Sequence, residues 1–513
     1  MMRRILAWSI AAAIVVSAGI VILASAQVPG LREVARRRTE LYLKERFKST
    51  VQISDFHVES IYPRVHVTAA GIVLRHEGRT DVPPLIQIKQ VAFDAEPLSL
   101  VSRRPVVKAV HVDGMEIQIP PHGPGTPSVL GRLPGEYPVT IEDVHADRVL
   151  IAILPADRSK AAREFALHHL ELKPVRPGQA AGFEATLTNP VPRGEIQTSG
   201  TFGPWNGDDP GSTAVSGHYV FQNANLGTIK GLGGILSSTG SFDGPLNYLS
   251  VAGETYTPDF SLRTSHHPVA LHTQFSAIVD GTNGNTILKD VVAQFEHSKL
   301  DVSGEVVDRT PKRGRTIELN AVSRGARVED LLRLAVGSDE PVMTGRAQLQ
   351  ARIEIREGDT DLIDRMHLNG QFGLSDAQFT NPQTEEKLDA LSLKGQGKPQ
   401  ESPVDNPASD LKGSFREDKG QVTFSRFTFG VEGAEVKLAG SYNLDSGDLD
   451  FRGKLRLQAK LSQTTTGVKS FFLKAVDPFL SGKNAGTVLP IKITGTKEKP
   501  TFALDFHDKL NHE

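Results

Sequence analysis

Hydrophobic and polar residues alternate along residues 449–461, which read LDFRGKLRLQAKL. Every odd position is apolar or glycine, and every even position is polar or charged. Because successive side chains of a β-strand point to opposite faces of a sheet, this two-residue period predicts one strand with an apolar face and a charged face. The large apolar positions of this predicted strand are Leu449, Phe451, Leu455, Leu457 and Leu461.

The same alternation recurs along most of the chain, for example in residues 51–53, 65–67 and 115–119. The 47 glycines and 31 prolines fall between such runs, where they punctuate turns. The pattern predicts a mainly β, antiparallel fold. A weak internal repeat, in which residues 281–304 align with residues 417–440, favours an elongated sheet built by adding similar strand pairs.

Helical patterns are few and short. Residues 29–48 and 327–336 have roughly helical apolar spacing, and residues 467–480 give the strongest amphipathic pattern. That last segment would either dock on the sheet and close the end of a groove, or contact a membrane. Its apolar positions include three phenylalanines, Phe471, Phe472 and Phe479.

The N-terminus carries an uncharged stretch of 22 residues, 5–26, which is long enough to cross a bilayer core of about 30 Å. We expect an uncleaved transmembrane helix; a signal peptide cleaved after Ala26 is the alternative. Arg3 and Arg4 before the span resemble an export signal, which favours export of everything after residue 28. Counting the more numerous basic residues after the span would favour the opposite orientation.

The composition removes several classes of function. The formal net charge of −2 leaves no basic footprint for nucleic acid, and the absence of cysteine excludes thiol catalysis, disulfides and cysteine-bound metal. The adjacent pairs His168-His169 and His266-His267 would point to opposite faces of a strand, so neither pair should share a metal ion. The sequence contains no metalloprotease, phosphate-loop or serine-hydrolase motif. We therefore expect no enzyme, no cofactor and no metal site.

Taken in order, these features resemble the AsmA-like family of Gram-negative envelope proteins. The likeness lies in the N-terminal span and basic helix, in residues 51–76, 83–93 and 106–120, in part of the middle section, and in residues 420–462, 471–480 and 489–506. The resemblance implies an inner-membrane anchor and a periplasmic body, similar to bridge-like lipid-transfer proteins, in which a long curved sheet forms an apolar groove. The apolar residues named above would then contact phospholipid acyl chains, and an envelope protein partner could complete the path.

The likeness divides the chain into four expected regions: a membrane anchor at 1–28, an α+β region at 29–120, a middle β-repeat region at 121–360, and a C-terminal β region at 361–513. Three alternatives to a lipid groove stay open. A closed β-sandwich would show the same alternation, with its apolar face filled by another sheet. A scaffold for outer-membrane proteins would bind partner strands at a sheet edge. A hydrolase of envelope polymers would need carboxylates or histidines that converge in one cleft.

Overall fold

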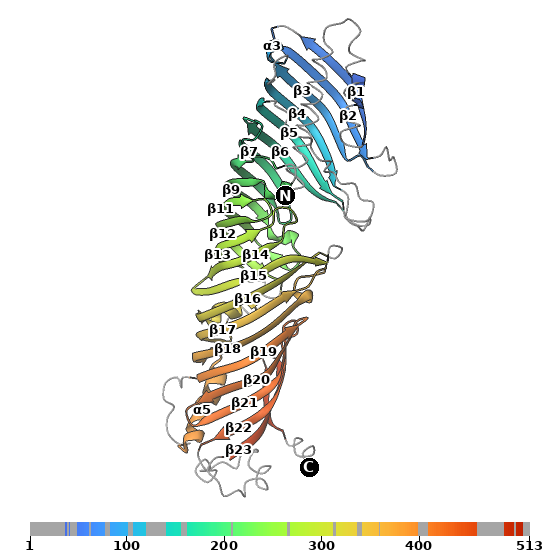
Figure 1. Cartoon of the computed structure of the whole chain (residues 1–513). Helices are drawn as coiled ribbons and strands as arrows, with labels where there is room; N and C mark the ends of the chain where they lie inside the picture. Colours follow the sequence, from blue (N-terminus) through green and yellow to red (C-terminus); the bar gives the residue numbers. More distant parts are fainter. Residues whose placement is uncertain are drawn as a thin grey trace. The chain divides into compact units, whose positions relative to one another are not determined.

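A computed structural model gives the arrangement of most of the 513-residue chain (Figure 1). The predicted membrane span 5–26 and the predicted helix 467–480 lie outside the residues that it describes. Among the described residues, no helix combines the length and apolar character needed to cross a bilayer. The described residues are 36–37, 40–41, 49–60, 63–76, 83–100, 106–119, 140–154, 162–206, 209–263, 267–310, 314–335, 341–358, 360–398, 409–458, 487–496 and 499–505.

The predicted mainly β class is confirmed, because the strands form one long, mostly antiparallel sheet with few helices in the described part of the chain. The first strands are β1 (Ser49–Ser60), β2 (Val65–His76), β3 (Ile86–Ala95), β4 (Val106–Ile119), β5 (Thr140–Ile153), β6 (Arg163–Lys173), β7 (Ala181–Pro190), β8 (Arg193–Phe202), β9 (Ala214–Asn225), β10 (Leu232–Gly233), β11 (Ile235–Pro245) and β12 (Leu249–Leu262). The later strands are β13 (Val269–Val279), β14 (Thr286–Phe295), β15 (Ser298–Thr310), β16 (Gly314–Arg327), β17 (Met343–Ile355), β18 (Met366–Phe379), β19 (Ser409–Asp418), β20 (Gln421–Val431), β21 (Ala434–Asn443), β22 (Asp448–Leu457), β23 (Thr487–Thr496) and β24 (Pro500–Leu504).

Helices are short. The α-helices are α3 (Pro97–Leu100), α4 (Val328–Ala335) and α5 (Pro382–Gln396), and the 3₁₀ turns are η1 (Pro210–Ser212), η2 (Leu226–Thr228) and η3 (Ile363–Arg365). Helix α4 confirms the prediction at 327–336, whereas α5 was not predicted. Of the predicted helix 29–48, the described residues 36, 37, 40 and 41 are helical.

The chain forms two compact units. Unit 1 comprises Met1–Thr228, Leu236–Thr255 and Phe275–Ile287, and unit 2 comprises Ile229–Ile235, Tyr256–Gln274 and Leu288–Glu513. Each unit has its own buried apolar cluster.

In unit 1, strands β1 to β9 pair in sequence order. One pair departs from the predicted antiparallel pattern, because β4 and β5 are parallel. A parallel pair needs a crossover rather than a tight hairpin, and the long segment 120–139 between these strands supplies the required length. One face of β1 to β7 is buried and apolar. Its largest fully buried side chains include Phe56, Ile86, Ile88, Met115 and Ile117.

The opposite, polar face of unit 1 shows where strand alternation fails as a guide. The register of β6 against β7 shifts between Leu167 and His169, so His168 is an extra residue in a β-bulge. His168 Nε2 lies 2.7 Å from Thr188 Oγ1, and His169 Nδ1 lies 2.8 Å from Asp147 Oδ1. The extra residue brings both imidazoles to the polar face. The prediction that these neighbours point to opposite faces is therefore wrong.

In unit 2, strands β15 to β24 form an unbroken series of antiparallel neighbours. Both copies of the sequence repeat consist of two strands joined by a two-residue turn, at residues 296–297 and 432–433. Glu296 and Gly433 have positive φ angles in these turns. The repeat is thus a recurring hairpin, in which adjacent strands pair without a long connection.

Candidate functional site

The side chains on one face of β17 to β24 form a mostly apolar surface, which we call the apolar face. Strand register places them in rows that run across the sheet. The covered row consists of Ala347, Leu374, Leu411, Phe429, Val436, Leu455 and Leu489. The aromatic row lies four residues away along β17 to β19 and β21 to β23, and five residues away along β20. It consists of Ala351, Gly370, Phe415, Phe424, Gly440, Phe451, Ile493 and Phe502. The row between them consists of Leu349, Phe372, Gly413, Phe427, Leu438, Gly453 and Ile491.

Phenylalanine rings dominate the middle of this face. Five of them project from β18, β19, β20 and β22. Their ring centroids are separated by 5.6 Å at the closest pair, Phe424 and Phe451, and by 6.4 Å at the widest contacting pair, Phe415 and Phe424. The five rings are those of Phe372, Phe415, Phe424, Phe427 and Phe451. Tilted and edge-on contacts at such distances are favourable for aromatic pairs.

Glycines in the neighbouring strands make room for these rings. A Cβ atom on Gly370 would lie 2.7 Å from the ring of Phe415, and one on Gly413 would lie 2.9 Å from the ring of Phe372. Each ring therefore covers a glycine on the adjacent strand. Any larger residue at either glycine would push its ring off the sheet.

Two helices cover one end of the apolar face. Helix α5 contacts β18, β20, β21 and β22, and α4 contacts β16 and β17. Leu331 and Leu332 of α4, and Leu388 and Leu391 of α5, pack against the buried apolar cluster of unit 2, which includes most of the covered row. The hydroxyl of Ser392 donates a 2.9 Å hydrogen bond to the backbone oxygen of Glu432, which fixes α5 to the β20–β21 turn.

From the covered row to the aromatic row, the side chains of the apolar face become less buried. Leu411 of the covered row is only 3% exposed, whereas the five phenylalanines of the aromatic cluster are partly exposed. Phe502, at the end of the aromatic row on β24, is 46% exposed. The face is therefore covered beside the helices and partly accessible to solvent at the aromatic row.

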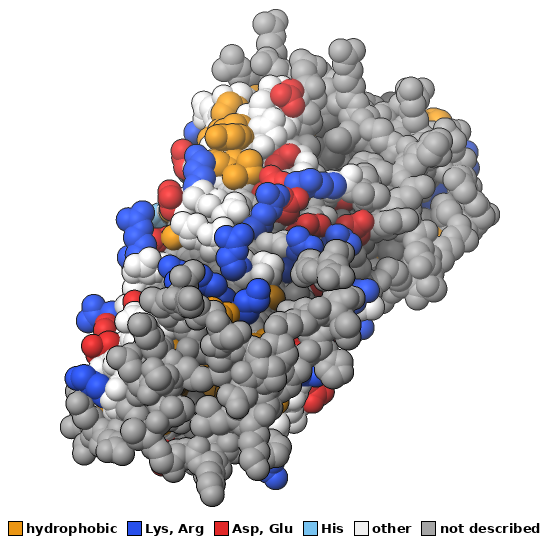
Figure 2. All heavy atoms as spheres, turned by 90° about the horizontal axis from the view of Figure 1, so that it is seen from below, with side chains coloured by type: hydrophobic (Ala, Val, Ile, Leu, Met, Phe, Trp, Pro, Cys, Tyr) orange, Lys and Arg blue, Asp and Glu red, His pale blue; other side chains and the backbone are white. Residues whose placement is uncertain are grey.

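The other side of the same strands is charged. Along β22, the residues that alternate with the apolar ones are Asp450, Arg452, Lys454 and Arg456, and all four are exposed. Neighbouring charges form exposed pairs, for example Lys437 with Glu435 at 3.1 Å. Charges of both signs are also interspersed on the surface seen in Figure 2, where hydrophobic side chains gather in one place. This distribution leaves the apolar face as the distinctive surface of unit 2.

The apolar face of unit 1 changes character after β7. At β8, β9 and β11 its inward positions include Thr198, Tyr219 and Ser238, and the hydroxyls of Tyr219 and Ser238 lie 3.1 Å apart. Burial raises the pKa of Tyr219 above its ordinary value. This hydroxyl-bearing stretch makes unit 2 the stronger candidate for an apolar ligand.

A buried carboxyl group lies beyond the aromatic row. Glu417 is 1% exposed and pairs in register with Leu368 on one side and Val422 on the other. Its Oε1 accepts a 2.8 Å hydrogen bond from the N–H of Gly420, and its Oε2 has no hydrogen-bond partner among the described residues. Burial raises the pKa of Glu417, the Gly420 hydrogen bond opposes that shift, and the charge of Asp418 adds to it.

We expect unit 2 to lose stability as the pH rises through the raised pKa of Glu417. A carboxyl group whose pKa is higher in the folded state favours folding while it is protonated. Its contribution to the free energy of unfolding is complete at a pH below the unfolded-state pKa of about 4.5, and it is lost at a pH above the folded-state pKa. The Glu417→Gln variant keeps an acceptor for Gly420 but cannot ionise. Hydrogen exchange of β18 to β20, compared at equal pH across a series, should show wild-type protection falling relative to the variant. Parallel pH profiles would contradict this expectation.

The structure places four of the predicted lipid-lining residues on the apolar face, because Leu449, Phe451, Leu455 and Leu457 all project from the same side of β22. Leu461, Phe471, Phe472 and Phe479 lie outside the described residues. Whether any of them lines a lipid path stays a prediction.

Sequence reasoning missed the phenylalanines of β18 to β20. The segment 424–429 reads FSRFTF, but the register shifts between Phe424 and Phe427, so a strict two-residue period would place these two rings on opposite faces. The sequence signal that could have indicated this cluster is the presence of four phenylalanines within residues 415–429. Their convergence with Phe372 and Phe451 depends on strand pairing, which composition does not reveal.

Comparisons of this chain with protein-family models, with curated proteins and with solved structures found no match.

Proposed function

We propose that this chain binds phospholipid acyl chains on the apolar face of unit 2, as an inner-membrane-anchored periplasmic protein of outer-membrane biogenesis. The observation that carries the proposal is the aromatic row, in which eight consecutive strands present apolar residues or glycine at partly exposed positions. Contiguous exposed apolar surface marks interaction sites on proteins.

The energetics of acyl chains suit this surface. Each methylene group removed from water contributes about 0.8 kcal/mol, so a lipid tail gains most from a lining without polar interruptions. At about 4.8 Å between neighbouring strands, the aromatic row offers roughly 34 Å of such lining. The phenyl rings supply flat, polarisable contact area, and the glycines between them provide room.

The two ends of the face favour one orientation of the ligand. Helices α4 and α5 close the covered end with leucine side chains, whereas Glu417 and Tyr442 lie in the row beyond the phenylalanines. We infer that the acyl chain lies over the phenylalanines and that the polar part of the lipid is directed away from the helices.

The cellular setting rests on the N-terminal sequence and on the AsmA-like resemblance. The uncharged stretch 5–26 supports an inner-membrane anchor, and the resemblance supports a periplasmic body with a curved groove.

The competing hypothesis, a scaffold that binds partner strands at a sheet edge, has less support. At the edge strand β1, Arg36 donates a 3.3 Å hydrogen bond to the backbone oxygen of Ile53, and Glu40 accepts a 3.0 Å hydrogen bond from the backbone N–H of Ile53. These side chains occupy backbone groups that a partner strand would need.

Binding of a fluorescent long-chain fatty acid to the full chain in detergent tests the proposal. Phe424→Asp should weaken binding about tenfold or more, because it removes a ring from the middle of the aromatic row and introduces a charge there. Thr423→Asp is the matched control, since Thr423 is the preceding residue, is exposed and projects from the charged side of β20. Equal affinities for wild type and Phe424→Asp would refute acyl binding at this face.

A further inference from the structure

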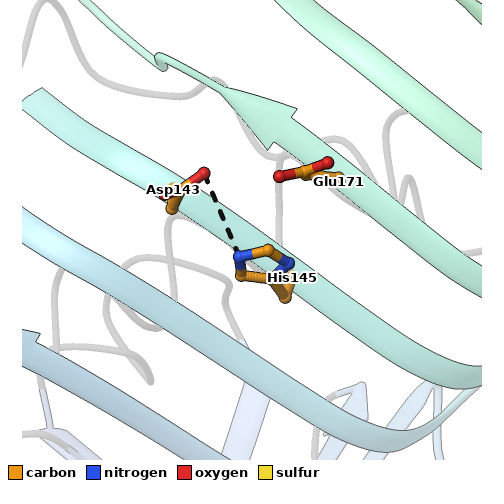
Figure 3. A group of neighbouring side chains, drawn as sticks. All are labelled: Asp143, His145 and Glu171. Atoms are coloured by element: carbon orange, nitrogen blue, oxygen red, sulfur yellow. Dashed lines mark ion pairs between the residues drawn. The ribbon is translucent and has the colours of Figure 1, made fainter.

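The polar face of unit 1 carries a group of potential metal ligands on two paired strands. Asp143 and His145 project from β5, and Glu171 projects from β6 directly opposite His145 (Figure 3). One ligand atom from each of the three side chains lies within 4.8 Å of the others. Two carboxylates and an imidazole are a donor set found for divalent transition metals, with Zn²⁺ foremost.

The contacts inside this group leave its ligand atoms free for an ion. Asp143 Oδ1 is shielded from solvent but has no hydrogen-bond partner among the described residues. His145 Nε2 lies 3.9 Å from Asp143 Oδ1, which is too far for a hydrogen bond (Figure 3). Two ligands of one tetrahedral zinc ion lie about 3.4 Å apart, so a small side-chain movement brings these atoms into position.

Neighbouring residues hold the two other ligands in place. The ring of His111, on β4, stacks on His145 with centroids 5.0 Å apart and planes inclined by 8°, which fixes the plane of the imidazole. Lys173 pairs with Oε1 of Glu171 and leaves the second carboxylate oxygen for an ion. Support of this kind around ligating side chains is characteristic of protein metal sites.

We propose that Asp143, His145 and Glu171 form a binding site for a divalent transition metal ion, and that this ion is Zn²⁺. The bound ion would link β5 to β6. The fourth position of a tetrahedral ion would be open to water or to an exogenous ligand. The site lies on the polar face of unit 1 and is independent of acyl binding by unit 2.

The chain contains a close comparison within its own sequence. Asp55 and His57 repeat the Asp-X-His spacing on β1, but there His57 Nε2 lies 2.7 Å from Asp55 Oδ2, at hydrogen-bond distance. In register, His57 faces Thr68 of the neighbouring strand rather than a carboxylate. Within the described part of the chain, this second motif is not grouped with a third potential ligand, so we do not expect it to bind the ion.

Titration of the metal-free full chain with Zn²⁺ against a chromogenic chelator tests the site. We expect one specific Zn²⁺ per chain, an affinity at least about tenfold lower in His145→Ala and in the isosteric Asp143→Asn, and an unchanged affinity in His57→Ala. Zn²⁺ should also protect the amides of β5 and β6 from hydrogen exchange in wild type but not in Asp143→Asn. Zinc binding that survives both substitutions, or no specific binding to a folded wild-type chain, would overturn the proposal.

Discussion

Phe451→Arg should leave unit 2 folded and abolish acyl binding, whereas Leu411→Arg should unfold it. Phe451 lies in the partly exposed aromatic row, so an arginine there can extend to solvent and costs about 1–2 kcal/mol of stability through lost ring contacts. Leu411 is 3% exposed in the covered row, and an unpaired charge buried there costs several kcal/mol. Thermal denaturation and fatty-acid binding of the two full-length variants measure the contrast.

This pair of substitutions separates an open face from a closed sandwich. If another layer filled the aromatic row, Phe451→Arg would bury a charge and destabilise the unit as strongly as Leu411→Arg. Equal collapse of both variants would therefore contradict an accessible face. Lys454→Glu serves as a control for charge alone, because Lys454 projects from the charged side of the same strand and is exposed.

Much of the strand architecture follows from local alternation. In β22 the side of every residue is predictable from 449–457, because the strand is regular and pairs with β21 and β23 without a register shift. Helix α4 is also predictable, since its apolar residues face the sheet and its acidic residues lie in the first turn. These elements carry their structural information within a few residues of sequence.

Features that depend on distant partners could not be predicted in this way. The bulges at His168 and between Phe424 and Phe427 reverse the alternation, and only the neighbouring strand reveals them. Helix α5 lacks a strong apolar stripe; Asn381 and Pro382 at its start were the available signal. The parallel pairing of β4 with β5 is likewise set by the crossover rather than by either strand's own sequence.

The candidate site was accessible to prediction only in part. The apolar side of β22 is a property of one strand, but the aromatic cluster arises because register places Phe415 beside Phe424 and Phe424 near Phe451. Gly370 and Gly413 contribute by their lack of a side chain, which no apolar pattern records. A surface assembled from several strands is therefore visible in the sequence only as separate fragments.

A photo-crosslinking phenylalanine analogue at position 451 should capture phospholipid in living cells, and the same analogue at position 452 should not. Phe451 and Arg452 are adjacent on β22 and project to opposite sides of the sheet. The two positions therefore differ in the face they belong to, but hardly in their position along the strand. The analogue retains the phenyl ring of Phe451. Its replacement of Arg452 removes two long ion pairs of an exposed arginine, at 3.8 Å to Asp450 and 4.0 Å to Asp505, which contribute little to stability.

Mass spectrometry of the crosslinked full chain identifies the adduct and the class of lipid. Phospholipid on position 451 alone would support acyl binding by the apolar face, and a crosslink there to another protein segment would instead indicate that the face is covered. Adducts of equal yield at both positions would point to general immersion in membrane, since positions 451 and 452 project from opposite sides of the strand and only one of them belongs to the apolar face. The proposal thus predicts that the yield of lipid adduct depends on which side of β22 carries the crosslinker, and not on its position along the chain.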